Sequence, residues 1–147
     1  NGLAWSPDGN IMYHSDSWQS TIWKYDYNKI TGDITNKNIF FKTNKRQGRP
    51  DGACVDMQGY YWSAGFDGGK LLRISPEGQL DREIILPMIR PTMPAFGGKD
   101  MKSIFITSFG NRKAYSNKFE NDTEAGKVIS INVGIVGIEE TLFKIKI

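Results

Sequence analysis

The sequence is poor in cysteine and histidine and has no long apolar run. One cysteine among 147 residues cannot form an internal disulfide, and it excludes a zinc cluster built on several cysteines. The single histidine, His14, excludes a His-rich metal site, and any Ser-His-Asp triad would depend on this residue. No apolar stretch approaches the ~18 residues of a transmembrane helix, so we expect no membrane partner.

Positive charge is in only small excess. The 19 Lys and Arg residues outnumber the 16 Asp and Glu residues only slightly, and the net charge is +3. Nucleic-acid-binding domains concentrate more basic charge on one face, so we expect no nucleic-acid partner. The first residues lack the basic leader and the apolar segment of a signal peptide. Together with the one free cysteine, this indicates a cytoplasmic protein.

Aromatic residues and glycines are well represented, and they fall into short strands and turns. Eight Phe, six Tyr and four Trp residues can build a packed core, and 16 glycines favour many turns. Runs of β-branched and aromatic residues bounded by turn residues predict strands. The predicted strands are residues 11–15, 21–25, 38–41, 53–56, 60–64, 71–74, 82–86, 103–107, 127–131 and 142–145. No segment of about ten or more residues keeps the 3.6-residue apolar period of a helix. The sequence therefore predicts an all-β fold.

The predicted strands repeat along the chain. Tyr13, Trp62 and Ile106 occupy equivalent positions in three successive units. A repeat of roughly 40–50 residues with four strands in each unit is typical of a β-propeller blade. The chain therefore divides into about three four-stranded blades, at approximately residues 1–48, 49–92 and 93–147.

Three blades are too few for a closed ring, because propellers have typically 4–8 blades. We therefore expect a partial β-propeller. Blades that precede Asn1, or a second copy of the chain, would complete the ring.

The segment between the first two predicted blades is basic. Residues 42–49 carry four Lys and Arg side chains, with Arg49 at the end of the segment. In one interpretation it is a solvated loop, and in the other it is a basic loop beside a pocket for an acidic ligand. The sequence leaves both interpretations open.

Several short motifs occur in a specific order along the chain. They are Asn-Gly-Leu-Ala-Trp-Ser at residues 1–6, Ile-Trp-Lys-Tyr-Asp-Tyr at 22–27, Thr-Gly-Asp-Ile-Thr-Asn at 31–36, Arg-Pro-Asp-Gly at 49–52 followed by Asp56, Gly59 and Trp62, Phe-Gly-Gly at 96–98 and Glu-Ala-Gly at 124–126. From residue 1 to about residue 138 this order resembles the gluconolactonase, regucalcin (senescence marker protein) and luciferin-regenerating enzyme family. That resemblance implies a six-bladed β-propeller, of which this chain would form the C-terminal half.

The resemblance implies one divalent metal ion at the centre of the propeller. The ligands in the family are a Glu from an early blade, the Asn of Asn-Gly-Leu and the Asp of Pro-Asp-Gly. Asn1 and Asp51 match the last two, whereas the early Glu has no counterpart in this chain. Amide and carboxylate oxygens suit Ca²⁺ best, with Mg²⁺, Mn²⁺ or Zn²⁺ as alternatives.

The resemblance also implies a hydrolase that opens sugar lactones to aldonic acids. Asp51 would be the catalytic residue, a general base that activates water. Without the early Glu, the chain by itself is expected to be inactive. The alternative is a non-catalytic propeller of the regucalcin type that binds calcium or a partner.

Two other aspartates have weaker signals. Asp16 matches a family position near the pocket, where it would contact the substrate. Otherwise it caps the end of a strand by accepting hydrogen bonds from nearby backbone amides. Asp56 belongs to an Asp-x-x-Gly turn, and we expect a structural role for it.

Overall fold

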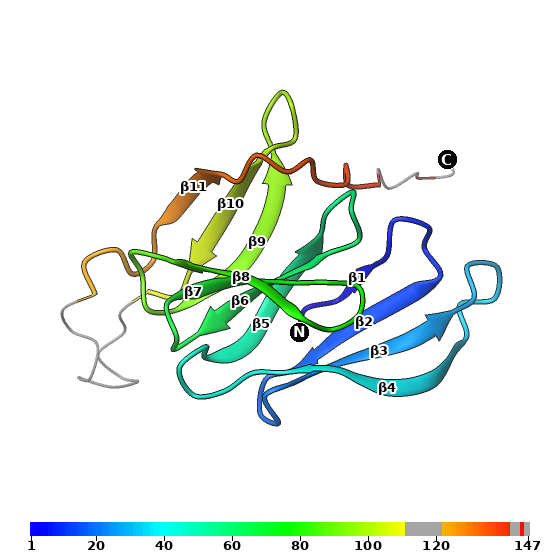
Figure 1. Cartoon of the computed structure of the whole chain (residues 1–147). Coiled ribbons are helices and arrows are strands. Elements are labelled where there is room, and N and C mark those ends of the chain that lie inside the picture. The colour runs from blue at the N-terminus through cyan, green and yellow to red at the C-terminus, as the bar shows by residue number, and fades with distance from the viewer. Residues whose placement is uncertain (111–121, 142–144, 146–147) are drawn as a thin grey trace.

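The computed structural model describes residues 1–110, 122–141 and 145, and Figure 1 shows how they are arranged. These residues form three antiparallel sheets, as the all-β prediction requires. Within each sheet, every strand pairs with the strand that follows it in the sequence. None of the described residues belongs to a helix long and apolar enough to cross a bilayer.

The sheets follow one another along the chain. The first contains β1 (Ala4–Trp5), β2 (Ile11–Asp16), β3 (Thr21–Tyr27) and β4 (Ile34–Lys42). The second contains β5 (Arg49–Val55), β6 (Tyr61–Phe66), β7 (Lys70–Ile74) and β8 (Leu80–Ile85). The third contains β9 (Pro91–Gly97), β10 (Ser103–Ser108) and β11 (Val128–Asn132).

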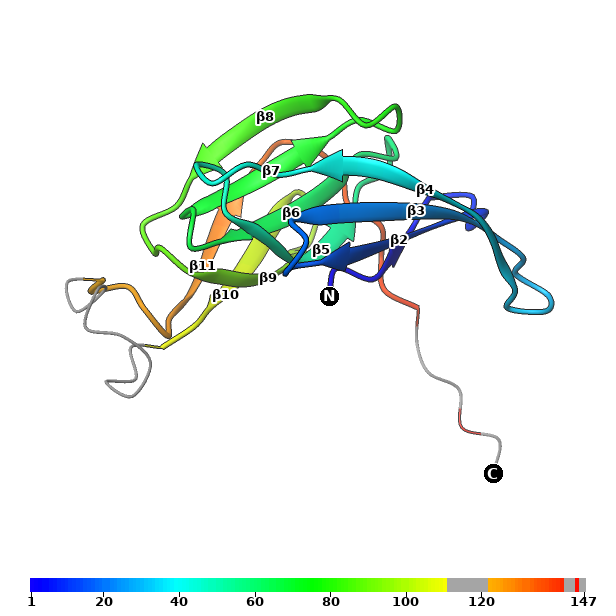
Figure 2. The same cartoon turned by 90° about the horizontal axis from the view of Figure 1, so that it is seen from below.

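The first strands of the three sheets are neighbours. β5 contacts β1 and β2 on one side and β9 on the other, so the second sheet lies between the other two. Figure 2 shows the same arrangement from below, with β5 between β2 and β9. This places the residues before β1 and the residues of β5 close together, although about 50 positions separate them in the sequence.

Strand β9 is absent from the strands that the sequence predicts. Pro91 and Pro94 lack a backbone N–H, which argues against a place inside a sheet. In the structure β9 is the edge of its sheet and pairs with β10 alone, so neither proline interrupts a second ladder. The third sheet therefore begins at Pro91, two residues before the expected start of the third blade at residue 93.

The third sheet has three strands among the described residues, instead of the four expected. The predicted strand at 142–145 lies, apart from Ile145, outside the described residues. After β11 the chain turns back towards the second sheet. The N–H of Met57 donates to the carbonyl of Val136 at 2.9 Å, and the N–H of Gly137 donates to the carbonyl of Met101 at 2.8 Å. These hydrogen bonds tie Val136 and Gly137 to both sheets.

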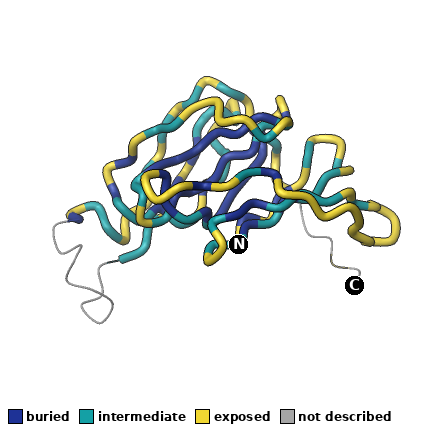
Figure 3. The backbone as a smooth tube through the Cα atoms, turned by 60° about the horizontal axis from the view of Figure 1, so that its bottom comes forward, coloured by how far each residue is buried: buried dark blue, intermediate teal, exposed yellow. Residues whose placement is uncertain are grey.

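The core consists of two apolar layers on either side of the second sheet. Tyr61 packs in the layer shared with the first sheet, and Trp62 packs in the layer shared with the third. Both side chains are fully buried, because successive residues of a strand point to opposite faces. Figure 3 shows this buried interior, with the exposed β4 strand at the margin. The second sheet thus acts as a middle blade, with both faces covered.

Candidate functional site

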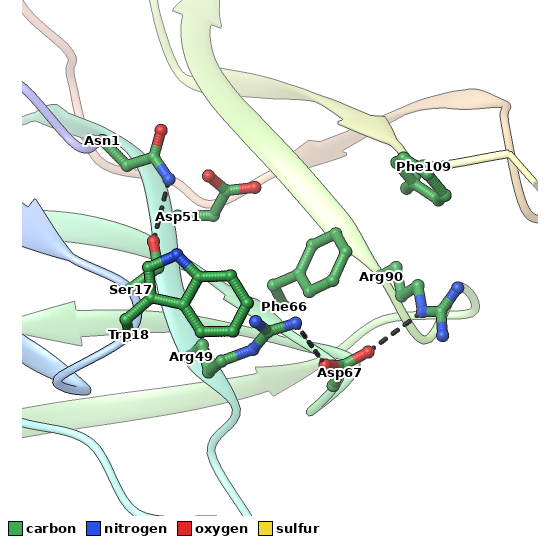
Figure 4. Close-up of a pocket in the computed structure, with 9 residues that line it drawn as sticks. All are labelled: Asn1, Ser17, Trp18, Arg49, Asp51, Phe66, Asp67, Arg90 and Phe109. Carbon is green, nitrogen blue, oxygen red and sulfur yellow. Dashed lines mark hydrogen bonds and ion pairs between the residues drawn. The ribbon is translucent and has the colours of Figure 1, made fainter. Parts of the chain in front are cut away.

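A pocket of about 420 Å³ lies where the first strands of the sheets meet (Figure 4). This volume is within the usual range for small-molecule sites. The residues that line it are Asn1, Ser17, Trp18, Arg49, Asp51, Phe66, Asp67, Arg90 and Phe109. They lie in strands of the second sheet and in the segments that adjoin the first and third sheets, so the pocket depends on how the sheets are arranged around one another. The structure thereby brings Asn1 and Asp51 into one cavity.

Asn1 is held in place by its backbone and by its amide nitrogen. Its carbonyl accepts a hydrogen bond from the N–H of Ser15 at 2.7 Å. Its side-chain Nδ2 donates to the Ser17 hydroxyl at 2.8 Å, and that hydroxyl donates to the carbonyl of Pro50 at 2.6 Å. Because the nitrogen is engaged with Ser17, the amide oxygen is left facing away from that contact (Figure 4).

The backbone conformation and the close contacts at Gly2 explain why a glycine follows Asn1. Its φ is +55°, a left-handed conformation that glycine adopts without strain. A Cβ atom at this position would lie 2.8 Å from the carbonyl oxygen of Asp51 and would also overlap the side chains of Ser15 and Tyr61. The Tyr61 hydroxyl donates to the Gly2 carbonyl at 2.6 Å. The glycine thus lets the Asn1 backbone approach the strand that carries Asp51.

Asp51 lies in β5 at an irregular point of the ladder. The register between β5 and β6 shifts between Pro50 and Ala53, which interrupts the regular pairing where Asp51 sits. No described residue donates a hydrogen bond to its carboxylate, although the side chain is half-buried. Burial raises the pKa of Asp51, and the amino group of Asn1 and the guanidinium of Arg49 oppose that rise. The carboxylate therefore faces the pocket with its charge only partly compensated.

These two residues fit part of a divalent-cation site. The Asn1 amide and the Asp51 carboxylate are hard oxygen donors, the kind that Ca²⁺ and Mg²⁺ prefer. Nowhere in the described ranges do three His, Cys, Asp or Glu side chains gather as a metal site. The two residues therefore supply two oxygen donors, and a further carboxylate from another part of the ring stays a prediction.

Residues 1–110 match the protein-family model described as the SMP-30/gluconolactonase/LRE-like region. The chain belongs to this family. Two curated relatives are similar to it. One is the 6-deoxy-6-sulfogluconolactonase of Pseudomonas putida, which is 40% identical over 97% of this chain and 49% of its own length. The other is the regucalcin of Danio rerio, which is 41% identical over 74% of this chain and 37% of its own length.

A solved structure has the same fold. A calcium-binding protein, regucalcin, from Agrobacterium tumefaciens superposes with a TM-score of 0.87 and 24% identity, over 99% of this chain and 49% of the other. The three sheets are accordingly blades of a six-bladed β-propeller. The chain spans about half the length of the family members it matches.

Asp16 lies outside the residues that line the pocket. It is the last residue of β2, and its Oδ1 accepts a hydrogen bond from the N–H of Gln19 at 3.0 Å. This contact is the strand-end cap that we expected as the alternative role. A role for Asp16 towards the substrate stays a prediction.

Asp67, Arg90 and three aromatic side chains form the far side of the pocket, and none of them was predicted as a site residue from the sequence. Phe66 ends β6, Asp67 follows it, and Phe109 comes directly after β10. Trp18 likewise follows β2. The repeat contains a signal for these residues, because the end of the second strand in each unit lies at the same edge of the ring.

Proposed function

We propose that this chain is part of a metal-dependent hydrolase that opens sugar lactones to aldonic acids. The observation that carries the proposal is the meeting of Asn1 and Asp51 in one pocket, where the Asp51 carboxylate has no described hydrogen-bond donor. The name of the Pseudomonas putida relative, a sulfogluconolactonase, supports the reaction class. The family match over residues 1–110 includes both residues.

The Asn1 amide oxygen and the Asp51 carboxylate would hold the divalent cation. Calcium is the proposed ion, because both ligands are hard oxygens and the regucalcin from Agrobacterium tumefaciens is called a calcium-binding protein. When bound, a divalent cation supplies stabilisation of the negative charge that develops on the lactone carbonyl oxygen. Ser17 orients Asn1 for this role by accepting a hydrogen bond from its Nδ2.

Asp51 is the proposed general base. Its carboxylate accepts a proton from a water molecule while the water oxygen bonds to the carbonyl carbon of the lactone. The bond from that carbon to the ring oxygen then breaks, and the ring oxygen takes up a proton. The products are a free carboxylic acid and a hydroxyl group on the same open chain, so one water is consumed for each lactone. Burial raises the pKa of Asp51, which makes its carboxylate a better proton acceptor than a fully solvated one.

The test is lactone hydrolysis by the protein encoded by the intact gene. Hydrolysis of glucono-1,5-lactone is followed by acid release, with the spontaneous rate subtracted. The proposal expects turnover that is lost in excess chelator and restored by a divalent cation. Asp33→Asn, at an exposed turn between β3 and β4, is the matched control. It should leave the rates of lactone turnover in chelator and in added cation unchanged. A rate no faster than the spontaneous reaction, with and without added metal, would overturn the proposal.

The second candidate is a non-catalytic calcium-binding propeller. The name of the Danio rerio relative, regucalcin, favours it. In the same assay, this candidate predicts calcium binding without lactone turnover. The two functions share Asn1 and Asp51 and differ in the chemistry that follows binding.

A further inference from the structure

A second charged cluster lies in the same pocket as Asn1 and Asp51. Asp67 bridges two arginines: Arg49 Nη2 donates to one carboxylate oxygen at 2.7 Å, and Arg90 Nε donates to the other at 3.0 Å. Figure 4 shows these three side chains on one side of the pocket and Asn1 with Asp51 on the other. The cluster has two positive charges for one negative charge.

Three separate parts of the chain build this cluster. Arg49 begins β5, Asp67 lies in the turn after β6, and Arg90 precedes β9. The backbone of Asp67 has φ of +66°, an uncommon conformation for a residue other than glycine. In this turn its carboxylate reaches both guanidinium groups at once. The two arginines are therefore held in place before any ligand arrives.

Aromatic rings support both guanidinium groups. The ring of Phe66 lies 5.0 Å from the Arg49 guanidinium and 5.8 Å from that of Arg90. Trp18 and Phe109 flank the cluster on either side, at 5.2 Å from Arg49 and 5.9 Å from Arg90. The side chains of Arg49 and Arg90 are 33% and 12% exposed. Their charge is thus partly withdrawn from water, which strengthens its attraction for an anion.

A buried arginine elsewhere in the chain shows the opposite balance. Arg73 binds two carboxylates, those of Asp56 and Asp81, and also the side-chain oxygen of Gln58. There one cation has two anions, as expected for a structural ion pair. In the pocket cluster one carboxylate, that of Asp67, is shared between two guanidinium groups, so neither Arg49 nor Arg90 has it to itself.

Arg49 has capacity for a further acceptor. Among the described residues, its side chain donates one hydrogen bond, to Asp67. A guanidinium carries five N–H donors in a planar fork, which matches the oxygens of carboxylate, sulfonate and phosphate groups. The neutral hydroxyls of a sugar do not require such a charge.

We propose that Arg49 and Arg90, held together by Asp67, bind an anionic substituent of the lactone substrate, a sulfonate or a phosphate at the end away from the reacting carbonyl. This inference rests on the proposed lactonase function, because it concerns the substrate of the same pocket. It assigns recognition to the arginine cluster and the reaction to Asp51.

The experiment compares three lactones with the protein encoded by the intact gene. They are glucono-1,5-lactone and its derivatives with a sulfonate or a phosphate at carbon 6. The inference expects kcat/KM at least about 10-fold higher for one anionic lactone than for the neutral one. The better of the two anionic lactones identifies the group that the site takes.

Arg49→Gln is the decisive variant. It should lower kcat/KM through KM, and the loss should be at least about 10-fold larger for the anionic lactone than for the neutral one. Arg49→Lys keeps the charge and should recover part of the loss. Arg82→Gln, at a 44% exposed arginine of β8, is the matched control and should change neither substrate. Circular dichroism confirms that each variant is folded.

Two results would overturn the inference while the lactonase function stands: equal turnover of neutral and anionic lactones by the unmodified protein, or an equal loss on both in Arg49→Gln. If no lactone is turned over, the proposed function fails, and calorimetry with 6-deoxy-6-sulfogluconate decides on the cluster separately. Binding that Arg49→Gln weakens about 10-fold or more supports an anion site. Binding that is absent, or that the variant leaves unchanged, overturns it.

Discussion

Two aspartates five positions apart have opposite surroundings. Asp56, directly after β5, is fully buried, and its carboxylate accepts hydrogen bonds from Trp62 Nε1 at 2.8 Å and from the Arg73 guanidinium at 2.8 and 3.0 Å. Backbone N–H groups of the following turn complete its hydrogen bonds. Asp51, inside β5, is half-buried and receives no hydrogen bond from any described residue.

This difference separates a structural carboxylate from one suited to chemistry. A buried charge with a full set of donors is stabilised in one geometry and has nothing left to offer a ligand. A carboxylate without donors destabilises the protein slightly, but it can bind a cation or accept a proton. The absence of described hydrogen-bond donors at Asp51 is thus the property that suits its carboxylate to bind a cation or accept a proton.

Asp51→Asn should have the largest effect, and the effect should fall on activity. Without the general base, kcat/KM for lactone hydrolysis should drop by about 10²–10⁴-fold. The free energy of unfolding should stay the same or rise, because a half-buried charge without donors is removed. Steady-state kinetics and urea denaturation measure the two quantities. A variant that unfolds readily, yet keeps its activity while folded, would reverse the assigned roles.

Asp56→Asn should affect stability instead. Removing the fully buried carboxylate leaves Arg73 with the partly exposed Asp81 as its remaining anion, so the free energy of unfolding should fall by about 3 kcal/mol. Asp81→Asn, at the partly exposed partner of the same arginine, is the control and should cost less than about 1 kcal/mol. Urea denaturation of both variants gives the comparison. Equal losses would show that burial does not distinguish the two carboxylates.

Gly52→Ala should affect both properties. A Cβ atom at Gly52 would lie 2.5 Å from the Thr92 carbonyl oxygen and 2.9 Å from the Met93 Cα, so β5 and β9 must move apart beside Asp51. We expect a loss of about 1–3 kcal/mol of stability and a lower kcat/KM. Gly97→Ala is the control, because its Cβ would meet only the ring of Phe105, which is 44% exposed and can move. Similar losses of stability and kcat/KM in both variants would exclude a special role for the close approach of β5 to β9 at Gly52.

The smallest expected effect is a loss of stability in acid from two carboxylates of β8. Hydrogen bonds from Arg73 hold the pKa of Asp81 below its usual value, and those from Lys70 and Gln47 do the same for Glu83. A depressed pKa stabilises the fold above the unfolded-state value and is lost as the pH falls through the folded-state value. Stability should therefore decrease below about pH 4, by less than about 1 kcal/mol for each group. Urea denaturation from pH 6 to pH 3 should show a smaller decrease in Asp81→Asn than in the unmodified protein.

Much of the fold could be predicted from the sequence, because strands and turns are local. The runs of β-branched and aromatic residues predicted most of the strands. The equivalent positions of Tyr13, Trp62 and Ile106 indicated the repeat. Strand β9 was not predicted, because its two prolines are acceptable only at the edge of a sheet. Which strand lies at the edge is a property of the whole sheet and not of a local pattern.

The candidate site was only half predictable. Asn1 and Asp51 were proposed from motifs, and the structure places both in one pocket. The bridge from Asp67 to Arg49 and Arg90 depends on how neighbouring blades are rotated, which no local pattern encodes. For the same reason, the Asp-x-x-Gly turn indicated a structural Asp56 but not its partner Arg73.

The most direct test of the central claim is calorimetric titration of Ca²⁺ into the chelator-treated protein from the intact gene, compared with its Asp51→Asn variant. We expect one saturable site in the unmodified protein and at least about a 10-fold loss of affinity in the variant. Asp33→Asn should bind as the unmodified protein does. Equal calcium affinity in the unmodified protein and in Asp51→Asn would contradict the account, because the pocket of Asn1 and Asp51 would then not be the metal centre.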